Sequence, residues 1–249
     1  MRNKKPSSPS QNNHPATTNS SFTMGQYYTL CNIDKRQRLS CSLSHLGTMF
    51  FSGQKLTEML ENLGFKPLLA LALLDLKAFT NDLNPLWGSW SGDRVVLLGD
   101  YCDAPPDFLT DEEKLELETK SKTLPQLVSA EFEDLVKDVK KWFTNNDRLG
   151  SLLGSREHVI VNLDKFEYMD PEEFGDYSSL DEFCLERGGV LRGLYSTLFY
   201  SSGTGGGDIE ALKIGRWAGD RLSIVEKNKL SEWYCEVSDD IQALLDRAR

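Results

Sequence analysis

Hydrophobic spacing in the first half of the chain, residues 24–148, predicts strands at its beginning and helices after them. Residues 27–33 are rich in aromatic and β-favouring side chains, and a polar turn separates them from residues 37–43, which predicts a β-hairpin. Leucine and methionine then recur at helical spacing over residues 53–63 and 66–80. We therefore expect a hairpin followed by two helices.

The remainder of this half is predicted to hold a second hairpin and a long helix. Residues 87–90 and 94–98 flank a Ser-Gly-Asp turn, which is typical of a hairpin. An acidic stretch covers residues 110–122. Apolar side chains then recur every three or four positions over residues 127–143, which predicts an amphipathic helix that begins near Thr123.

The second half, residues 155–249, repeats much of this order. Its predicted elements are a strand over 158–163, a turn at Asp164-Lys165, a helix from Ser179, a helix over 191–199, a hairpin over 215–224, a strand over 231–237 and a final helix capped by Ser238. We expect the buried face of this final helix to contain Ile241, Leu244, Leu245 and Ala248. The order predicts an α+β fold in each half.

Two motifs occur once in each half. The sequence G-x-W-x-G-D-R spans residues 88–94 and recurs at residues 215–221, and N-x-D-K spans residues 32–35 and recurs at residues 162–165. Two landmarks in the same order predict an internal duplication. We therefore expect two related units, each a small, mainly antiparallel sheet packed with helices, linked near residues 145–155 and arranged about a pseudo-twofold axis.

Composition narrows the classes of partner and compartment. The chain has 249 residues and a formal net charge of −10, which argues against a nucleic-acid backbone as its main partner. Its five cysteines are scattered without a CxxC pair, so we expect reduced thiols in the cytosol or the nucleus. No apolar stretch reaches the roughly 18 to 20 residues of a membrane span, and residues 1–23 are predicted to be a disordered tail.

The repeated motifs contain the candidate binding residues. An adjacent acid and base could position a ligand beside a tryptophan, which makes the candidates Trp90, Asp93, Arg94, Trp217, Asp220 and Arg221. A structural interpretation also accounts for every residue type, because Gly-Asp favours hairpin turns, an aspartate can bind local backbone N–H groups, and the arginine could stack on the tryptophan. The turn residues of N-x-D-K have the same two interpretations, and the turn chemistry favours the structural one.

An enzymatic alternative gathers acidic groups of the first half at one end of the sheet. Asp34, Asp93 and Asp100 would act as acid/base groups or as ligands for a hard cation such as Mg²⁺, with Arg94 beside them. No sequence signature of a nucleophilic enzyme or of a zinc site accompanies the histidines, and no cofactor or metal is assigned. The glycine-rich loop at residues 203–207 lacks the ending of a phosphate-binding loop.

Several of these motifs resemble those of a known group of proteins. Met24-Gly25-Gln26-Tyr27-Tyr28, the N-x-D-K turn, and W-x-G-D-R followed by Gly99-Asp100-Tyr101 resemble a group of uncharacterised proteins of filamentous fungi, with looser relatives in bacteria and phages. The resemblance implies two such units in tandem and no particular activity. The second half departs from it, because it lacks the GQYY opening and has Glu226-Lys227-Asn228 at the Gly-Asp-Tyr position.

These observations predict an intracellular, non-enzymatic binding or interaction protein whose partner is a protein or a small molecule. The alternative is a metal-assisted hydrolase with its site in the first half, at Asp34, Asp93, Arg94 and Asp100. A diverged duplicate without a ligand is a third interpretation, and the sequence alone leaves the three open.

Overall fold

A computed structural model of the chain describes residues 28–40, 88–100, 102, 104–135, 158–170, 173, 197–200 and 214–247. Its strands are β1 (Tyr28–Asn32), β2 (Gln37–Ser40), β3 (Arg94–Gly99), β4 (Glu133–Asp134), β5 (His158–Asn162), β6 (Glu167–Met169), β7 (Phe199–Tyr200), β8 (Asp220–Glu226) and β9 (Cys235–Glu236). Its helices are α3 (Asp111–Lys120), α4 (Leu124–Glu131), α8 (Ser238–Arg247) and the 3₁₀ helix η5 (Lys227–Lys229). This is a mixed α+β fold.

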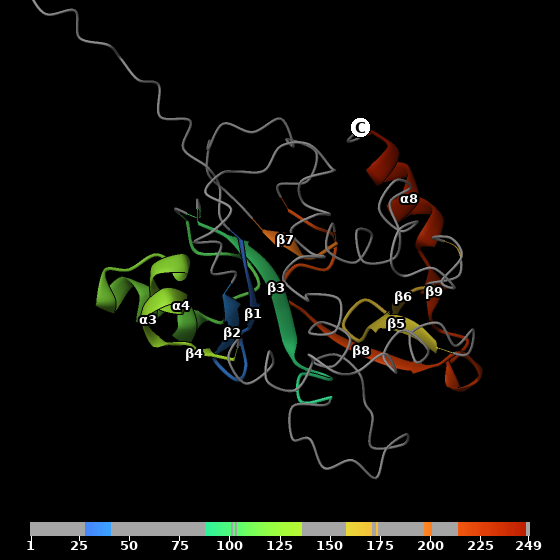
Figure 1. The fold of residues 1–249 in the computed structure, drawn as a ribbon, viewed down its shortest axis with the longest axis horizontal. Helices are drawn as coiled ribbons and strands as arrows, with labels where there is room; N and C mark the ends of the chain where they lie inside the picture. Colours follow the sequence, from blue (N-terminus) through green and yellow to red (C-terminus); the bar gives the residue numbers. More distant parts are fainter. Residues whose placement is uncertain are drawn as a thin grey trace, which may run out of the picture.

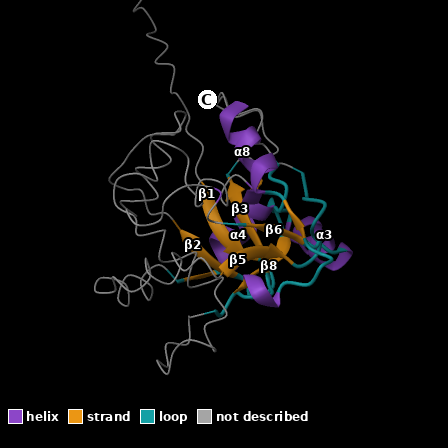
Figure 2. Ribbon diagram, turned by 90° about the vertical axis from the view of Figure 1, so that its right-hand side faces the viewer, coloured by secondary structure: helices purple, strands orange, loops and turns teal. Residues whose placement is uncertain are grey.

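The described strands form one mixed sheet with the order β4-β2-β1-β3-β8-β5-β6-β9, and β7 pairs with β3 beside this path. The five pairs among β1, β2, β3, β5, β6 and β8 are antiparallel, whereas β4, β7 and β9 each add in parallel. Figure 1 shows α3 and α4 beside β1, β2 and β4, and α8 near β6 and β9. In Figure 2, α3 lies to one side of the strands. Because β3 and β8 are neighbours, the sheet continues from one half into the other.

The predicted first hairpin is confirmed, and its register is set by the polar turn. Asn32 pairs with Gln37 at the end of the β1–β2 ladder. Arg36 closes the turn with a φ of 53°. β5 and β6 form a second hairpin in which Asn162 pairs with Glu167 and Phe166 has a φ of 54°. The strand β6 was missed from the sequence because it is only three residues long.

The hairpins predicted at the two G-x-W-x-G-D-R motifs are wrong. Residues 88–93 and 216–219 form turns rather than strands, and the strand that follows each turn pairs with other parts of the chain. Gly92 and Gly219 have φ values of 83° and 78°, which glycine adopts without steric cost. Each turns its backbone toward the opposite half.

These two glycines join the halves by reciprocal hydrogen bonds. The N–H of Gly92 donates to the carbonyl of Leu222 at 2.7 Å, and the N–H of Gly219 donates to the carbonyl of Val95 at 2.9 Å. Between these bonds, Arg94 lies directly opposite Arg221 in the antiparallel ladder. The motifs therefore build the junction between β3 and β8.

The helix predicted over residues 127–143 is also wrong in extent. α4 ends at Glu131, because Phe132 is extended with a ψ of 138° and the chain enters β4 beside β2. The buried side chains of Phe132 and Leu135 continue the apolar pattern without continuing the helix. Periodicity did not reveal this change because both conformations bury the same apolar residues.

The acidic stretch forms a helix that its weak amphipathicity did not predict. α3 begins with a capping box, in which the Thr110 hydroxyl accepts from the Glu113 N–H and the Glu113 carboxylate accepts from the Thr110 N–H. Three acidic residues in the first turn also favour the helix dipole. The capping box and these charges thus mark the beginning of a helix in which Leu117 is the buried side chain.

The remaining predicted elements have mixed outcomes. The last predicted helix is confirmed as α8, with Ile241 buried, but Ser238 is its first residue rather than its cap, and the Ser238 hydroxyl accepts from the Asp170 N–H. The predicted strand over 231–237 is reduced to β9. Of the helix predicted over 191–199, residues 197–198 are helical, Phe199 lies in β7, and residues 191–196 lie outside the described part of the chain. The helices predicted over 53–63 and 66–80, the helix from Ser179, the N-terminal tail and the 145–155 linker lie outside the described residues.

One core cluster fills the space between the first half of the sheet and its helices. It combines strand residues with side chains of α3 and α4: Cys31, Ile33, Val96, Leu98, Cys102, Leu109, Leu117, Leu124, Leu127, Val128, Phe132 and Tyr200. Phe108 and Ala218 pack against its edge. Since Ala218 belongs to the second motif, this core reaches the junction between the halves.

The two junction glycines differ in their surroundings, which gives a matched test of the fold. A Cβ added to Gly219 would lie 2.6 Å from the Phe108 Cβ and closer to its ring, whereas a Cβ at Gly92 would meet nothing within 4 Å. Gly92→Ala should lower the free energy of unfolding by about 1 kcal/mol through its positive φ. Gly219→Ala should cost about 1–3 kcal/mol more, because the core must also move. Urea unfolding of both variants measures the difference, and equal losses would contradict this packing.

Candidate functional site

In the first half, the two motifs meet through a buried amide and a carboxylate. The Asn32 side chain donates to Asp93 Oδ2 at 2.7 Å, and its own carbonyl oxygen accepts from the Lys35 N–H at 2.8 Å. The Lys35 ammonium also binds Asp93 and the Ser89 carbonyl. Asn32 is fully buried. This network ties the β1–β2 turn to the turn that precedes β3.

The second acid of the turn, Asp34, binds the arginine of the other motif. Asp34 accepts from the Arg94 N–H and from Arg94 Nε, each at 2.7 Å. The expectation that the motif aspartate binds local backbone N–H groups is wrong, because Asp93 accepts from the side chains of Asn32 and Lys35. Asp34 does bind a backbone N–H, but it is that of Arg94, 60 residues further along the chain. Arg94 pairs with carboxylates and does not stack on Trp90 as the structural interpretation suggested.

The second half makes the same set of bonds. Asn162 donates to Asp220 at 2.7 Å and accepts from the Lys165 N–H at 2.9 Å. The Lys165 ammonium binds Asp220 and the Arg216 carbonyl. Asp164 accepts from the Arg221 N–H at 2.7 Å and from its Nε at 2.8 Å. The bonds that link Asn32, Asp34, Lys35, Asp93 and Arg94 to one another in the first half therefore each have a counterpart in the second.

The motif tryptophans belong to the core. Trp90 and Trp217 are fully buried. Trp90 Nε1 donates to Gln37 at 2.9 Å, and Trp217 Nε1 donates to Glu167 at 2.7 Å. The indoles contribute buried apolar area, and their single polar atom is satisfied by the first residue of β2 or β6. Such burial leaves neither ring a surface on which a ligand could stack.

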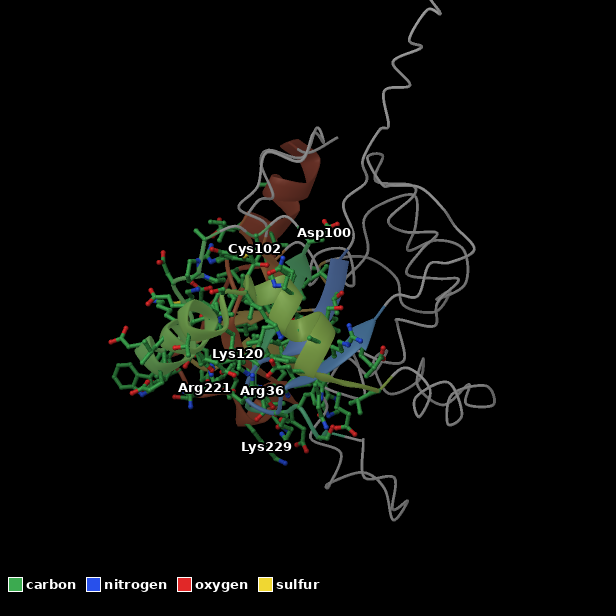
Figure 3. The ribbon with its side chains drawn as sticks, turned by 90° about the vertical axis from the view of Figure 1, so that its left-hand side faces the viewer. Arg36, Asp100, Cys102, Lys120, Arg221 and Lys229 are labelled. Carbon is green, nitrogen blue, oxygen red and sulfur yellow. The ribbon has the colours of Figure 1, made fainter. Side chains whose placement is uncertain are left out.

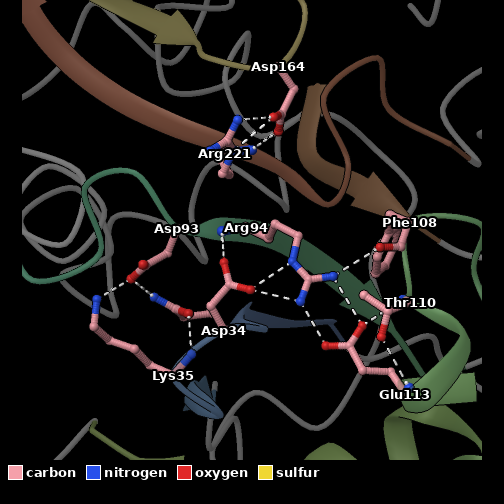
Figure 4. Close-up of polar contacts among 10 residues, drawn as sticks. Asp34, Lys35, Asp93, Arg94, Phe108, Thr110, Glu113, Asp164 and Arg221 are labelled. Carbon is pink, nitrogen blue, oxygen red and sulfur yellow. Dashed lines mark hydrogen bonds and ion pairs between the residues drawn. The ribbon is translucent and has the colours of Figure 1, made fainter.

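Arg94 and Arg221 lie side by side on one face of the sheet. Residues directly opposite in an antiparallel pair place their Cβ atoms about 5 Å apart on the same face, and like charges there repel. Each guanidinium is neutralised by the aspartate of its own half, Asp34 or Asp164. Figure 4 shows the two ion pairs next to each other.

The two arginines differ in what covers them. Arg94 also forms a bidentate pair with Glu113 of α3, at 3.0 and 2.7 Å, and donates to the Phe108 carbonyl at 3.1 Å. Its side chain is 18% exposed, whereas that of Arg221 is 52% exposed. Within the described residues, Asp164 is the carboxylate that Arg221 contacts.

Hydrogen bonds and nearby positive charge favour the ionised forms of Glu113 and Asp164. Burial alone would raise the pKa of Glu113, but hydrogen bonds from Arg94 and the Thr110 N–H, with the Arg94 charge, hold it below its ordinary value. Burial would also raise the pKa of Asp164. The hydrogen bonds and the charge of Arg221 outweigh this effect, so the pKa of Asp164 lies below its ordinary value. The Glu113 hydrogen bond is the main cause that raises the pKa of Arg94. Permanently charged groups of this kind suit ion pairing better than proton transfer at neutral pH.

The candidate catalytic residues are only partly brought together. Asp34, Asp93 and Arg94 lie at the beginning of β3, but Asp100 follows its end, and a six-residue strand spans roughly 20 Å. Figure 3 shows Asp100 far from Arg36 of the β1–β2 turn. In the part of the chain that the structure describes, no group of three or more His, Cys, Asp or Glu side chains could hold a metal ion.

A small pocket opens between the β1–β2 turn and the helices α3 and α4. Its volume is about 120 Å³, Asp34, Arg36 and Glu113 contribute polar groups, and Leu117 and Leu127 contribute apolar ones. Ligand pockets for small molecules usually occupy about 300–1,000 Å³. The pocket is therefore large enough for a few water molecules or one side chain.

Sequence reasoning missed the partners that come from outside the motifs. Glu113 could have been found, because Thr110-x-x-Glu113 matches the capping-box pattern at the start of a helix. Gln37 and Glu167 follow the N-x-D-K turn by two residues in both halves, but their bonds to the tryptophans depend on the tertiary fold. No local signal indicates those contacts.

Comparison of the chain with models of protein families, with curated proteins and with solved structures finds no match. The resemblance to the fungal group therefore stays a prediction. None of the described helices combines the length and the apolar character needed to cross a bilayer. Of the cysteines, Cys31, Cys102 and Cys235 are described, and they form no disulfide.

Removing the charge of Glu113 should make the chain less stable in a pH-dependent way. Glu113→Gln retains a capping-box acceptor but loses the ion pair with Arg94. Because the folded pKa of Glu113 is depressed, the ion pair stabilises the fold above the unfolded pKa, and its contribution is lost as the pH falls through the folded pKa. We expect a deficit of about 1 kcal/mol at pH 7, reduced by solvent screening.

Urea unfolding of both proteins from pH 7 to pH 3 measures this change. The two free energies of unfolding should converge as the pH falls below the ordinary glutamate pKa and through the lower folded pKa of Glu113. A constant deficit over the whole range would show that the variant disturbs packing or capping instead.

Proposed function

We propose that the chain is a non-enzymatic binding protein built from two related units, in which the repeated motifs hold the fold together and other surfaces bind the partner. The observation that carries this proposal is the bond-by-bond match between the two motif networks. A duplicated catalytic centre would be expected to retain free acids, whereas here the same acids are used for the same internal bonds twice.

The chemistry of the network supports a structural role. Asp93 and Asp220 each accept from a buried asparagine and a lysine, and Asp34 and Asp164 each accept from an arginine side chain and its N–H. Such charge-assisted bonds are stronger than neutral ones, and breaking one leaves a partner unsatisfied. A substrate or a hard cation would have to displace these bonds to reach the carboxylates.

Two matched substitutions test the proposal against the hydrolase alternative. Asp93→Asn and Asp220→Asn remove equivalent charges that are 18% and 17% exposed. If both aspartates are structural, each variant should lose about 1–3 kcal/mol of unfolding free energy, because a lysine loses its ion-pair partner. Thermal and urea unfolding of the full chain, with and without Mg²⁺ or Mn²⁺, provide the measurement.

The hydrolase predicts a different pattern. If the first half holds a metal site, Mg²⁺ or Mn²⁺ at 100 times its Kd should stabilise the wild-type protein by about 2.7 kcal/mol. Asp93→Asn should abolish this stabilisation, and Asp220→Asn should retain it. That asymmetry, with a stable Asp93→Asn fold, would overturn the proposed function. Equal losses without a metal effect would support it.

A further inference from the structure

Among the described residues, a contact that covers Arg94 in the first half has no counterpart at Arg221 in the second. In the first half, the segment from Phe108 to Glu113 wraps Arg94, with the Phe108 carbonyl and the Glu113 carboxylate both accepting from its guanidinium. Arg221 occupies the matched position, and its outer nitrogens meet neither a second carboxylate nor a carbonyl among the described residues.

The junction glycines show the same asymmetry independently of the arginines. The Phe108 ring lies against Gly219, whereas the space above Gly92 contains no atom within 4 Å of an added Cβ. The reciprocal bonds of these glycines make the two positions equivalent. The first half therefore places an aromatic ring on the second, and nothing in the described part of the chain returns that contact.

The connection between strands explains why the described part of the second half lacks this cover. The chain between β3 and β4, residues 100–132, holds α3 and α4. The chain between β8 and β9, residues 227–234, holds only the 3₁₀ helix η5. Glu133 and Cys235 nevertheless make the same backbone bond, to the carbonyls of Arg36 and Phe166 respectively. The strands were retained, and the helices above them are absent from this connection.

The turn that supplies Asp164 to Arg221 ends in an aromatic residue, Phe166, where the matched turn of the first half ends in a paired arginine, Arg36. Arg36 binds Glu116 of α3, and its guanidinium carbon lies over the Phe132 ring, 5.6 Å from the ring centroid. At the matched position, Phe166 is 54% exposed and packs edge-on against Tyr234, with 5.7 Å between the ring centroids. Trp233, the residue before Tyr234, is 74% exposed. Exposed aromatic residues near an arginine are typical anchors of protein interfaces.

We propose that the second half docks the acidic first turn of a helix from a partner protein, in the way that the first half binds α3. Arg221 binds a carboxylate at the third position of that helix, a preceding aromatic residue covers Gly92, and an apolar side chain one turn further along packs on Phe166. We choose a helix with this pattern because α3 makes the equivalent contacts in the first half. Its Glu113 accepts from Arg94, the counterpart of Arg221, and its Glu116 accepts from Arg36, the counterpart of Phe166. This inference rests on the proposed binding function.

The chain itself supplies a probe for the docking site. A synthetic peptide of residues 106–122 contains Phe108, the capping box and α3, and can be titrated into the isotope-labelled full-length protein. At millimolar peptide, amide signals of Gly92, Arg221 and Phe166 should shift in a saturable manner. A peptide with Glu113→Gln should bind about tenfold more weakly, because it lacks the charged acceptor. This change cannot disturb the folding of the protein.

Two variants of the protein complete the test. Arg221→Gln should weaken binding of the unmodified peptide about tenfold and remove its preference over the Glu113→Gln peptide. Lys229→Gln removes the same charge from an exposed side chain that pairs with Glu226, and should leave binding unchanged. The amide spectrum of each variant reports whether its fold is intact.

Three results would overturn the docking site. They are the absence of shifts at Gly92, Arg221 and Phe166, equal affinity for both peptides, or shifts confined to Ile33 and Arg94, where the peptide would merely replace α3. Any of these leaves the proposed function standing if Asp93→Asn and Asp220→Asn are equally destabilised. Unequal destabilisation with a metal effect would instead overturn the proposed function itself.

Discussion

The structure depends on the antiparallel contact between β3 and β8, where two arginines face each other and two glycines exchange backbone bonds. Arg94 opposite Arg221 would repel in isolation. The contact is stable because each half brings its own aspartate from a neighbouring turn, and that turn is fixed by an asparagine that binds the motif acid. The spacing N-x-D-K and the pattern G-x-W-x-G-D-R are thus two parts of one requirement: to place a neutralised arginine at the junction.

Matched bonds do not make the halves equivalent. α3 and α4 cover Arg94 and deepen the core of the first half, and Phe108 extends this cover onto Gly219. Beside Arg221 the described chain provides a short connection and exposed aromatic residues. In the part of the chain that the structure describes, the first half thus buries its junction arginine more deeply than the second half does.

The sequence predicted the parts of this arrangement that have a local cause. The β1–β2 hairpin follows from β-favouring residues on either side of a polar turn, and α8 follows from an amphipathic pattern. The long helix after Thr123 failed at Phe132 because apolar side chains pack equally well from α4 and from the extended chain after it. The hairpins at the motifs failed because Gly92 and Gly219 bond to the opposite half, and no local pattern reports a partner so distant in the sequence. The residues of the two motifs interact with one another, and Glu113, Gln37 and Glu167 complete the network through contacts that no local pattern indicates.

Hydrogen exchange at the junction tests the central claim most directly. The N–H groups of Gly92, Gly219 and Leu222 donate across the contact between β3 and β8. If this contact joins the halves into one cooperative sheet, these amides should exchange as slowly as those of Val96 and Ile224 within the strands, with the free energy of global unfolding. Fast exchange at the three junction amides, with Val96 and Ile224 still protected, would show two halves that fold separately and would contradict the account.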